Sequence, residues 1–495
     1  MASKIFKILE TLQKRLLYFV TNENQLPSDA KVGLICGLIS PKDANVTYCT
    51  SAVVRQNVSP FGSTPVGIYC LIKEATNEQI LENLTNLIPK KSGIAVVISV
   101  AEDEKSLKVL FVDLKTKAFC DCLSEFVDDE KLLIDSLITR VMANIQLCVD
   151  FNREKEAFEN NAKKAFDALK DTIKSTNFKL KDSAFILSSN GAKDSVICGD
   201  LYSFVEDDEI KEIDGVNASA DLKRKMKDKL RKQKAAAKLP LVFTLEINSK
   251  GSGDVPTSDD EPLSIEPNAK DVTFAVSIDV AILTDKLTNC GSMRKTFVTA
   301  VQRQIREMCD CFIFFADLNS LKLHIPKAYT FWPQSQCSYF SSLVYPIGLT
   351  DDELIKRRTE LHDLLLLPKN RPYIRKLNKY QFPGEPNFIG DKLCNPHVGL
   401  TTGMKCSAVS VVHGVYTYHH YMQDKINDNG WGCAYRSLQT IVSWFKHQGY
   451  TEKPIPTHKE IQQALVDIGD KQPNFVGSTQ WIGSQEVSYV LNQLY

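Results

Sequence analysis

Neither an excess of charge nor a long hydrophobic run is present in this 495-residue sequence. Its 60 lysine and arginine residues balance 60 aspartate and glutamate residues, so no long-range field favours nucleic acid or a membrane surface as a partner. Residues 272–283 are apolar but contain Asp279 and are too short to cross a bilayer, and residues 5–19 are interrupted by Lys7 and Glu10. These patterns exclude a secretory leader and a membrane-spanning helix.

Cysteine is plentiful but lacks the spacing of a metal site. The 14 cysteines include the pairs Cys120/Cys122 and Cys309/Cys311, and none of them forms a Cys-x-x-Cys motif. In a long chain without a leader they are expected to be reduced and mostly buried thiols. We therefore predict no zinc site.

The chain is longer than one hydrophobic core usually serves, so two or more domains are expected. Short apolar runs alternate with helical patterns, which is typical of α/β or α+β structure. The predicted strands are residues 32–39, 65–72, 93–100, 107–114 and 272–283, and the predicted helices are residues 78–87, 131–149, 294–309 and 351–366.

These patterns divide the chain into three parts. Residues 1–366 form a mixed α/β region, residues 367–391 a connector with little periodicity, and residues 392–495 a final domain. The predicted fold class is α+β.

Two segments of the first region are unusual in composition. Residues 221–238 are rich in lysine and arginine. Such a run is typical of a solvated helix balanced by the acids at residues 206–212, or of a contact to RNA, an import receptor or an anionic membrane. We prefer the first interpretation. Residues 249–270 are rich in glycine, serine, proline and acid, which predicts a flexible loop.

The candidate chemistry is concentrated around Cys433. Turn-forming residues with one tryptophan precede it at residues 427–432, and apolar residues then recur at helical spacing as far as Gly449. Cys433 is therefore predicted to open a helix, where free amides and the helix dipole favour a thiolate and stabilise an oxyanion. On periodicity alone, a buried structural cysteine is an equal alternative.

The string Gly-Trp-Gly-Cys-Ala-Tyr-Arg-Ser-Leu-Gln at residues 430–439 resembles the nucleophile motif of the ubiquitin-fold-modifier-specific peptidases. These are papain-like thiol proteases that process a ubiquitin-like modifier. Asn-Pro-His-Val-Gly-Leu at residues 395–400 and Gln-Trp-Ile-Gly-Ser at residues 480–484 resemble flanking segments of that family. The long region before residue 392 is similar to the family's longer, type 2 form. Residues 392–495 then correspond to the N-terminal part of a papain-like domain.

The resemblance implies a cysteine peptidase that matures the modifier precursor and removes the modifier from conjugated proteins by isopeptide hydrolysis. It implies Cys433 as the nucleophile, the Tyr421 hydroxyl as part of the oxyanion hole and Trp431 as a wall of the substrate cleft. It implies no metal and no organic cofactor.

The resemblance also implies partners and a location. The partners are the modifier, its protein conjugates and an endoplasmic-reticulum adaptor bound by a recognition region at residues 1–366, and no nucleic acid is expected. The implied location is the cytoplasm, with recruitment to the endoplasmic reticulum, and also the nucleus.

The family's Asp-Pro-His box, which supplies the general base and the residue that orients it, does not follow Cys433 here. His447 lies nearly four turns along the predicted nucleophile helix, and His458 follows Thr457 in a helix-capping box with Glu460. Neither is expected to serve as the base.

Two further histidine groups are excluded as the base. Asn-Pro-His at residues 395–397 matches the domain entry of the family rather than its box, and His413, His419 and His420 are expected to pack or to lie on the surface.

The last apolar stripe, in a helix that Ser484 is expected to cap, is still running at Tyr495. We therefore expect a truncated peptidase domain that hydrolyses little or no substrate by itself.

Two other functions remain open. The autophagins, a related class of thiol proteases, also carry Gly-Trp-Gly-Cys, but Met-Leu-Arg usually follows where this sequence has Ala434-Tyr435-Arg436. Alternatively, the chain is a non-catalytic fragment that binds the modifier or an adaptor.

Overall fold

The computed structural model describes residues 4–88, 93–103, 105–189, 195–216, 218–236, 238–246, 262–333, 336–385, 388–389, 391–398, 410, 412, 414–448, 450–451 and 453–495. The chain forms two compact units, Met1–Ile374 and Arg375–Tyr495, which divide within the connector predicted at residues 367–391. Helices and strands are mixed in the first unit, in agreement with the predicted α+β class. Among the described residues we find no helix that combines the length and apolar character needed to span a membrane.

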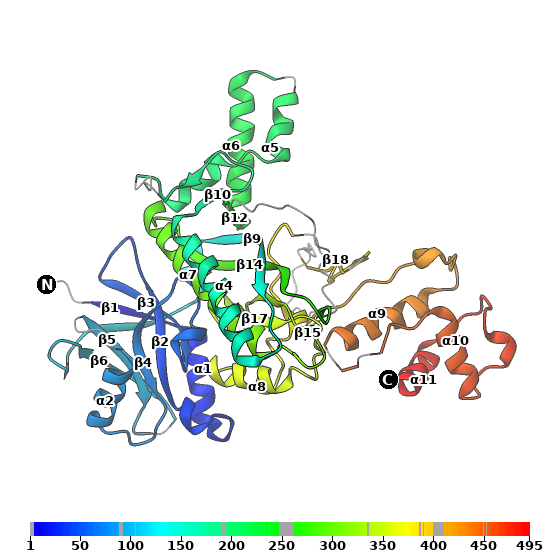
Figure 1. The fold of residues 1–495 in the computed structure, drawn as a ribbon, viewed down its shortest axis with the longest axis horizontal. Coiled ribbons are helices and arrows are strands. Elements are labelled where there is room, and N and C mark those ends of the chain that lie inside the picture. Colours follow the sequence, from blue (N-terminus) through cyan, green and yellow to red (C-terminus); the bar gives the residue numbers. More distant parts are fainter. Residues whose placement is uncertain are drawn as a thin grey trace. The chain divides into compact units, whose positions relative to one another are not determined.

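The first unit begins with an eight-stranded sheet of strand order β7-β6-β5-β4-β2-β3-β1-β8 (Figure 1). The strands predicted at residues 32–39, 65–72, 93–100 and 107–114 are all present. Residues 5–9 form a strand because they pair with β3 and β8. The strands are β1 (Ile5–Leu9), β2 (Val32–Ile39), β3 (Val46–Val53), β4 (Thr64–Cys70), β5 (Ile94–Val100), β6 (Leu107–Asp113), β7 (Ala118–Phe119) and β8 (Leu123–Val127).

Helices cover both faces of this sheet. Helix α1 (Glu10–Thr21) packs on the face that includes Ile35, whereas α2 (Asn77–Leu87) and α8 (Ile355–Leu364) pack on the face that includes Leu34. Neighbouring residues of β2 thus enter opposite cores, as the alternation of side chains in a strand requires. Helix α8 begins later than predicted because Thr350 and Glu353 first close a turn, with the Thr350 amide donating to Glu353 Oε2 at 2.7 Å.

The second sheet has the order β11-β10-β12-β9-β14-β16-β17. Its centre is the long antiparallel pair β9/β14, which runs in register from Ser136 opposite Asp285 to Asp150 opposite Asp271. The strands are β9 (Ser136–Asp150), β10 (Asn177–Leu180), β11 (Ile186–Leu187), β12 (Leu241–Glu246), β14 (Asp271–Asp285), β16 (Pro326–Phe331) and β17 (Ser341–Pro346).

The helix predicted at residues 131–149 is wrong. Only α3 (Glu130–Ile134) is helical there, and the chain continues as strand β9. From Asn144 to Asp150 the more buried and less buried residues alternate, which is the period of a strand. The strand forms because β14, far along the chain, pairs with its whole length.

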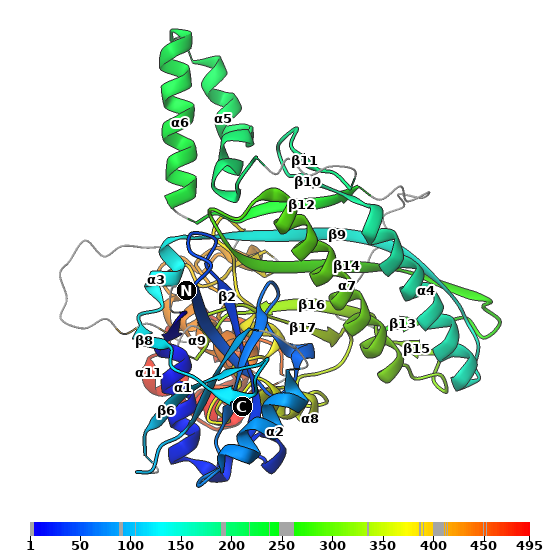
Figure 2. The same ribbon diagram turned by 90° about the vertical axis from the view of Figure 1, so that its left-hand side faces the viewer.

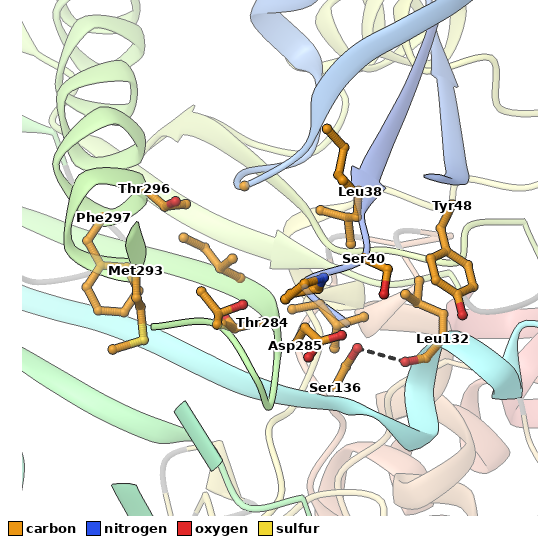
Figure 3. Close-up of a pocket in the computed structure, with 16 residues that line it drawn as sticks. Leu38, Ser40, Tyr48, Leu132, Ser136, Thr284, Asp285, Met293, Thr296 and Phe297 are labelled. Atoms are coloured by element: carbon orange, nitrogen blue, oxygen red, sulfur yellow. Dashed lines mark hydrogen bonds between the residues drawn. The ribbon is translucent and has the colours of Figure 1, made fainter. Parts of the chain in front are cut away.

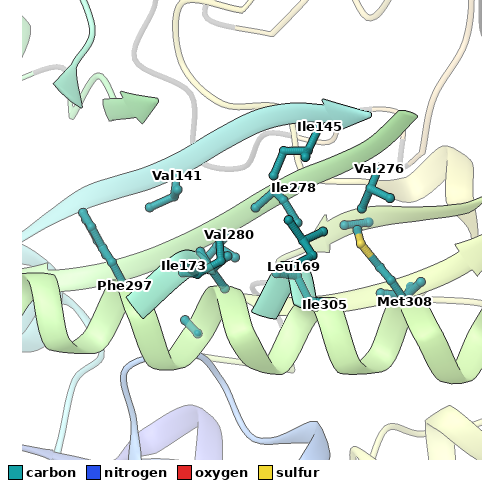
Figure 4. Close-up of a cluster of buried hydrophobic side chains, with 14 of the residues drawn as sticks. Val141, Ile145, Leu169, Ile173, Val276, Ile278, Val280, Phe297, Ile305 and Met308 are labelled. Carbon is teal, nitrogen blue, oxygen red and sulfur yellow. The ribbon is translucent and has the colours of Figure 1, made fainter. Parts of the chain in front are cut away.

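Helices α4 (Lys155–Ser175) and α7 (Cys290–Phe314) pack against the second sheet and against each other. Figure 4 shows side chains of β9 and β14, such as Val141 and Val280, facing Ile173 of α4 and Phe297 of α7. The strand predicted at residues 272–283 and the helix predicted at residues 294–309 are confirmed, each with wider bounds.

The basic segment predicted at residues 221–238 forms helix α6 (Ala220–Ala236), which stands beside α5 (Asp208–Glu212) and projects from the second sheet (Figures 1 and 2). One face of α6 is paired with acids that precede it: Lys227 with Asp214 at 2.8 Å, and Lys234 with Glu209 at 2.8 Å. No residue of α6 is buried. The solvent-exposed helix and the nearby acids of the preferred interpretation are therefore both present.

The loop predicted at residues 249–270 lies outside the described residues as far as residue 261. Its last part is structured, which corrects the prediction. Strand β13 (Leu263–Ser264) pairs with β15 (Lys322–Leu323), and Ile265 is buried. These apolar residues join the core and end the loop early.

In the second unit, β18 (Phe388–Ile389) pairs with β19 (Lys392–Leu393), and α9 (Cys433–His447), α10 (His458–Asp467) and α11 (Ser484–Leu494) share one core. Helix α10 begins with the predicted capping box, in which Glu460 accepts the Thr457 amide at 2.7 Å. Ser484 is the first residue of α11 rather than its cap. Gly483 holds the cap position, and its amide donates to Glu486 at 3.0 Å.

Candidate active site

A tight turn leads into helix α9 and places Cys433 at its first residue. The carbonyl oxygen of Asp428 accepts the amides of Trp431 at 3.2 Å and of Gly432 at 2.8 Å, and Gly430 has a φ of +82°. Position 432 requires glycine because a Cβ there would lie 2.5 Å from Asp428 Oδ2. The prediction that Cys433 opens a helix is confirmed.

Cys433 is exposed, and Gly432 supplies no side-chain cap for the helix. The first amides of an α-helix have no acceptor within the helix, and the helix dipole adds a partial positive charge at that end. A carbonyl oxygen that gains negative charge next to Cys433 would be stabilised there.

The Tyr421 hydroxyl and the Cys433 thiol are near enough to influence one another electrostatically. The pKa of Tyr421 is raised by partial loss of solvent, then by this interaction with Cys433, and further by the negative charge of Asp428. At neutral pH the phenol therefore stays protonated and can donate a hydrogen bond. The structure thus brings together two of the residues that the sequence predicts for the site.

Trp431, predicted to form a wall of the cleft, is partly buried. Its ring packs edge-on against Tyr435, with centroids 5.4 Å apart, and against His458, with centroids 5.5 Å apart. Part of the indole is therefore anchored in the core of the second unit, next to the turn that carries the thiol.

A buried polar network that the sequence analysis missed lies beneath the turn. Asp428 is fully buried and Arg436 is 3% exposed. Asp428 Oδ2 accepts Arg436 Nε at 2.6 Å and lies 3.1 Å from His458 Nε2, while Oδ1 accepts the Met422 amide at 2.7 Å. Arg436 also donates to Asp424 at 2.7 Å.

The network sets the charge of Asp428. Burial alone would raise the pKa of Asp428, but the Met422 amide and the Arg436 guanidinium hold it below its ordinary value. A partial signal was present in the sequence, because Asp428 and Arg436 flank the Gly-Trp-Gly-Cys string at a helix start. Only the fold shows that their side chains meet.

The histidines are engaged elsewhere. His458 is the first residue of α10 and its ring stacks on Tyr435 at 4.9 Å. His447 is buried on α9, fourteen residues beyond Cys433 and therefore roughly 20 Å away along the helix. His397 Nδ1 lies 2.9 Å from the Tyr416 hydroxyl.

His419 and His420 were expected to pack in the core or to lie on the surface. His419 is buried, as expected of a packed residue, and His420 is exposed with its ring beside Tyr421. His413 lies outside the described residues.

Among the pockets of the first unit, two adjoin helix α7. One, of about 90 Å³, lies between β2, β14 and α7, and Figure 3 shows the Ser136 hydroxyl donating to the Leu132 carbonyl beside it. The other, of about 460 Å³, is lined by residues of α7 and α8, among them Glu307 and Phe314. Within the described part of the chain we find no group of three or more His, Cys, Asp or Glu residues placed to hold a metal ion.

Two family profiles match the chain. Residues 163–387 match the N-terminal region of Ubiquitin-fold modifier 1 specific protease 2, and residues 407–495 match peptidase family C78. The second match contains Cys433, Tyr421 and Trp431.

Curated proteins with similar sequences include the Ufm1-specific proteases 2 of Gallus gallus, Mus musculus and Homo sapiens. The chicken protein is 36% identical over 370 residues, covering 72% of this chain and 77% of the relative. The mouse protein is 36% identical over 376 residues with the same coverage. The human protein is 48% identical over 224 residues, covering 45% of this chain and 47% of the relative.

A crystal structure of UfSP from C. elegans is similar in fold. It aligns with 99% of this chain and 79% of its own at a TM-score of 0.54 and 18% identity. The two profiles that match are those of the family that the motif around Cys433 resembles.

Proposed function

The chain belongs to the family of Ufm1-specific proteases 2, and from this we propose that it is a cysteine peptidase that matures the Ufm1 precursor and removes Ufm1 from conjugated proteins. One observation carries the proposal. The exposed thiol of Cys433 stands at the N-terminus of α9, and its interaction with the Tyr421 hydroxyl contributes to the raised pKa of that phenol.

The proposed reaction forms and breaks a thioester. The Cys433 sulfur attacks a carbonyl carbon at the modifier's C-terminus, and the negative charge moves to the carbonyl oxygen, where the Cys433 amide and the Tyr421 hydroxyl donate to it. The C–N bond then breaks and the amine leaves with a proton. Water hydrolyses the thioester and releases the modifier.

The general acid and base of this reaction correspond to the family's Asp-Pro-His box, which this sequence does not contain after Cys433. His458 already bonds Asp428, and His447 is buried far along α9. The residues described here supply the sulfur nucleophile and the oxyanion donors of the reaction.

The test uses the full chain and Ufm1 precursor. Intact-mass spectrometry follows the cleaved tail and any modifier bound to the enzyme through a thioester. Cys433→Ser should abolish both products, whereas Cys148→Ser, which changes another exposed cysteine, should leave both unchanged. Cleavage that persists in Cys433→Ser contradicts the proposal.

A binding role without catalysis predicts a different result. Wild-type chain would then form neither product but would still retain Ufm1 on a column, with equal affinity in Cys433→Ser. That pattern would replace the peptidase proposal with the alternative of a modifier-binding fragment.

For location, we propose a cytoplasmic protein that an adaptor recruits to the endoplasmic reticulum through the first unit, Met1–Ile374. The support is the family resemblance and the match of residues 163–387 to the N-terminal region of the type 2 proteases. Tagged full-length chain should colocalise with an endoplasmic-reticulum marker, and a tagged second unit should not. Equal distribution of the two proteins would contradict the proposal.

A further inference from the structure

We propose that Asp428 is a positioning residue. It holds the Tyr421 hydroxyl and the helix start at Cys433 in the relative positions that attack on the carbonyl requires. The inference rests on the proposed function and adds a residue outside the nucleophile, the oxyanion donor and the Asp-Pro-His box. Its basis is that this one buried residue bonds the backbone next to both reactive side chains.

On one side, Asp428 holds the segment that carries Tyr421. The Met422 amide, which directly follows Tyr421, donates to Asp428 Oδ1 at 2.7 Å. Met422 has a φ of +64°, a left-handed conformation that side chains other than glycine rarely adopt. The bond to a fixed carboxylate stabilises this reversal of the chain and so sets where the phenol points.

On the other side, Asp428 holds the segment that carries Cys433. Its carbonyl oxygen accepts the Gly432 amide at 2.8 Å and the Trp431 amide at 3.2 Å, which closes the turn before α9. The side chain also touches that turn, since only the missing Cβ of Gly432 leaves room for Asp428 Oδ2. A shift of the Asp428 side chain would therefore move both segments.

Asp428 is itself held rigidly. Arg436, one turn after Cys433, donates Nε to Oδ2 at 2.6 Å and is fixed in turn by Gln439 at 3.1 Å and the Gln423 carbonyl at 2.8 Å. The neutral His458 ring offers a second donor to Oδ2 at 3.1 Å.

A carboxylate suits this position better than an amide does. Two oxygens here accept from three donors, and asparagine would turn an NH₂ donor toward Arg436 or Met422. The negative charge of Asp428 also contributes to the raised pKa of Tyr421, after solvent loss and the interaction with Cys433. It thereby favours the protonated hydroxyl, the form that can donate to an oxyanion.

The experiment is a double-mutant cycle on the full chain, with p-nitrophenyl acetate as a generic acyl donor. Attack by the Cys433 sulfur forms a C–S bond and releases p-nitrophenolate, whose absorbance burst gives the acylation rate. The trace of Cys433→Ser is subtracted to remove reaction at other thiols. Asp428→Asn is measured with Tyr421 present and again in Tyr421→Phe.

If Asp428 acts through Tyr421, Asp428→Asn should slow acylation by about 10- to 100-fold with Tyr421 present, because small displacements of reacting groups cost that much. In the Tyr421→Phe background it should slow acylation by less than about 3-fold. Equal effects in both backgrounds, or no effect in either, would overturn the inference.

A matched control tests whether any change of a carboxylate in this unit slows acylation, and a second variant replaces Asp428→Asn if that variant does not fold. Asp470→Asn changes a carboxylate of the same unit that pairs with Lys471, outside the network of Asp428, and it accepts neither the Met422 nor the Gly432 amide, so acylation should change by less than about 2-fold. If Asp428→Asn has lost the tryptophan fluorescence of the folded chain, Gly432→Ala takes its place. Its added methyl displaces the carboxylate without removing the charge and should show the same dependence on Tyr421.

The readout separates this inference from the proposed function. Acylation by p-nitrophenyl acetate needs neither Ufm1 nor the Asp-Pro-His box. Chain that acylates at Cys433 but does not process Ufm1 would contradict the proposed function and leave the Asp428 cycle valid. Normal processing of Ufm1 with additive effects in the cycle would contradict the inference alone.

Discussion

At the scale of single residues, the site joins an exposed sulfur, a phenol and a buried carboxylate within thirteen consecutive positions, residues 421–433. The phenol is the residue whose chemistry is simplest to isolate. Phenylalanine keeps the ring of Tyr421 and removes only the hydroxyl, whose pKa is raised in part by Cys433.

If the Tyr421 hydroxyl donates to the oxyanion of the transition state as proposed, Tyr421→Phe should lower kcat for Ufm1 precursor by about 100-fold and change KM by less than about 3-fold. Steady-state kinetics, or single-turnover kinetics where turnover is slow, give both constants. Tyr418→Phe, which removes an exposed hydroxyl nearby in the chain, serves as the control. An unchanged kcat in Tyr421→Phe would assign the oxyanion donors to backbone amides alone.

At the scale of elements, ion pairs attach one face of helix α6 to the acidic segment that precedes it. Its side chains at Lys227, Arg231 and Lys234 face acids at residues 206–214 and are 12–17% exposed. On another face of the same helix, Lys225 is 72% exposed in the side chain and pairs only with Asp221 within α6. Replacing lysine or arginine by alanine should therefore have different effects on the two faces of α6.

The triple variant Lys227→Ala, Arg231→Ala and Lys234→Ala should detach α6 from the segment before it, because several partly buried pairs are lost together. Hydrogen–deuterium exchange in residues 208–236 should rise by about 10-fold, while β9 and β14 keep their protection. Lys225→Ala, Lys229→Ala and Lys232→Ala together form the matched control, which should exchange like wild type. Equal exchange in both triple variants would show that the ion pairs do not hold the helix.

At the scale of the whole molecule, the two units contain buried ionisable groups with opposite effects on stability. In the second unit, burial lowers the pKa of His419 and of His447 to about 4. In the first unit, burial raises the pKa of Glu307 to about 7, against the opposing effect of Arg303. Burial also lowers the pKa of His362 in the first unit.

The signs follow from proton linkage. A histidine whose pKa is lowered in the folded state binds fewer protons there than in the unfolded state. The stability that it contributes to the protein is therefore complete above pH 6.5 and is lost as pH falls toward 4. Each of the two histidines can remove on the order of 3 kcal/mol over that window. Glu307, with a raised pKa, contributes stability that is complete below pH 4.5 and is lost as pH rises through about 7.

Acidification from pH 7 to pH 5 should therefore destabilise the second unit more than the first. Urea unfolding measures this, because Trp332 reports the first unit and Trp431, Trp444 and Trp481 report the second. In Trp332→Phe the remaining fluorescence follows the second unit, and its midpoint should fall. His447→Gln should reduce that fall, and a midpoint that stays constant from pH 7 to pH 5 would contradict the assignment.

Much of this protein follows from local sequence. Four strands of the first sheet, the capping box of Thr457 and the helix that opens at Cys433 were predicted because periodicity, caps and turn residues act over a few neighbours. The motif around Cys433 also identified the family, because its residue types at that spacing are specific.

Tertiary structure decided the rest. Residues 136–150 are a strand because β14, more than 100 residues later, pairs with them. The local sequence pattern does not indicate which distant segment will be that partner. The bond between Asp428 and His458 likewise joins α10 to the turn before α9. Sequence periodicity depends on which residues one element buries, whereas contacts between distant elements depend on the whole fold. The candidate nucleophile could therefore be predicted from the sequence, and the buried network beneath it could not.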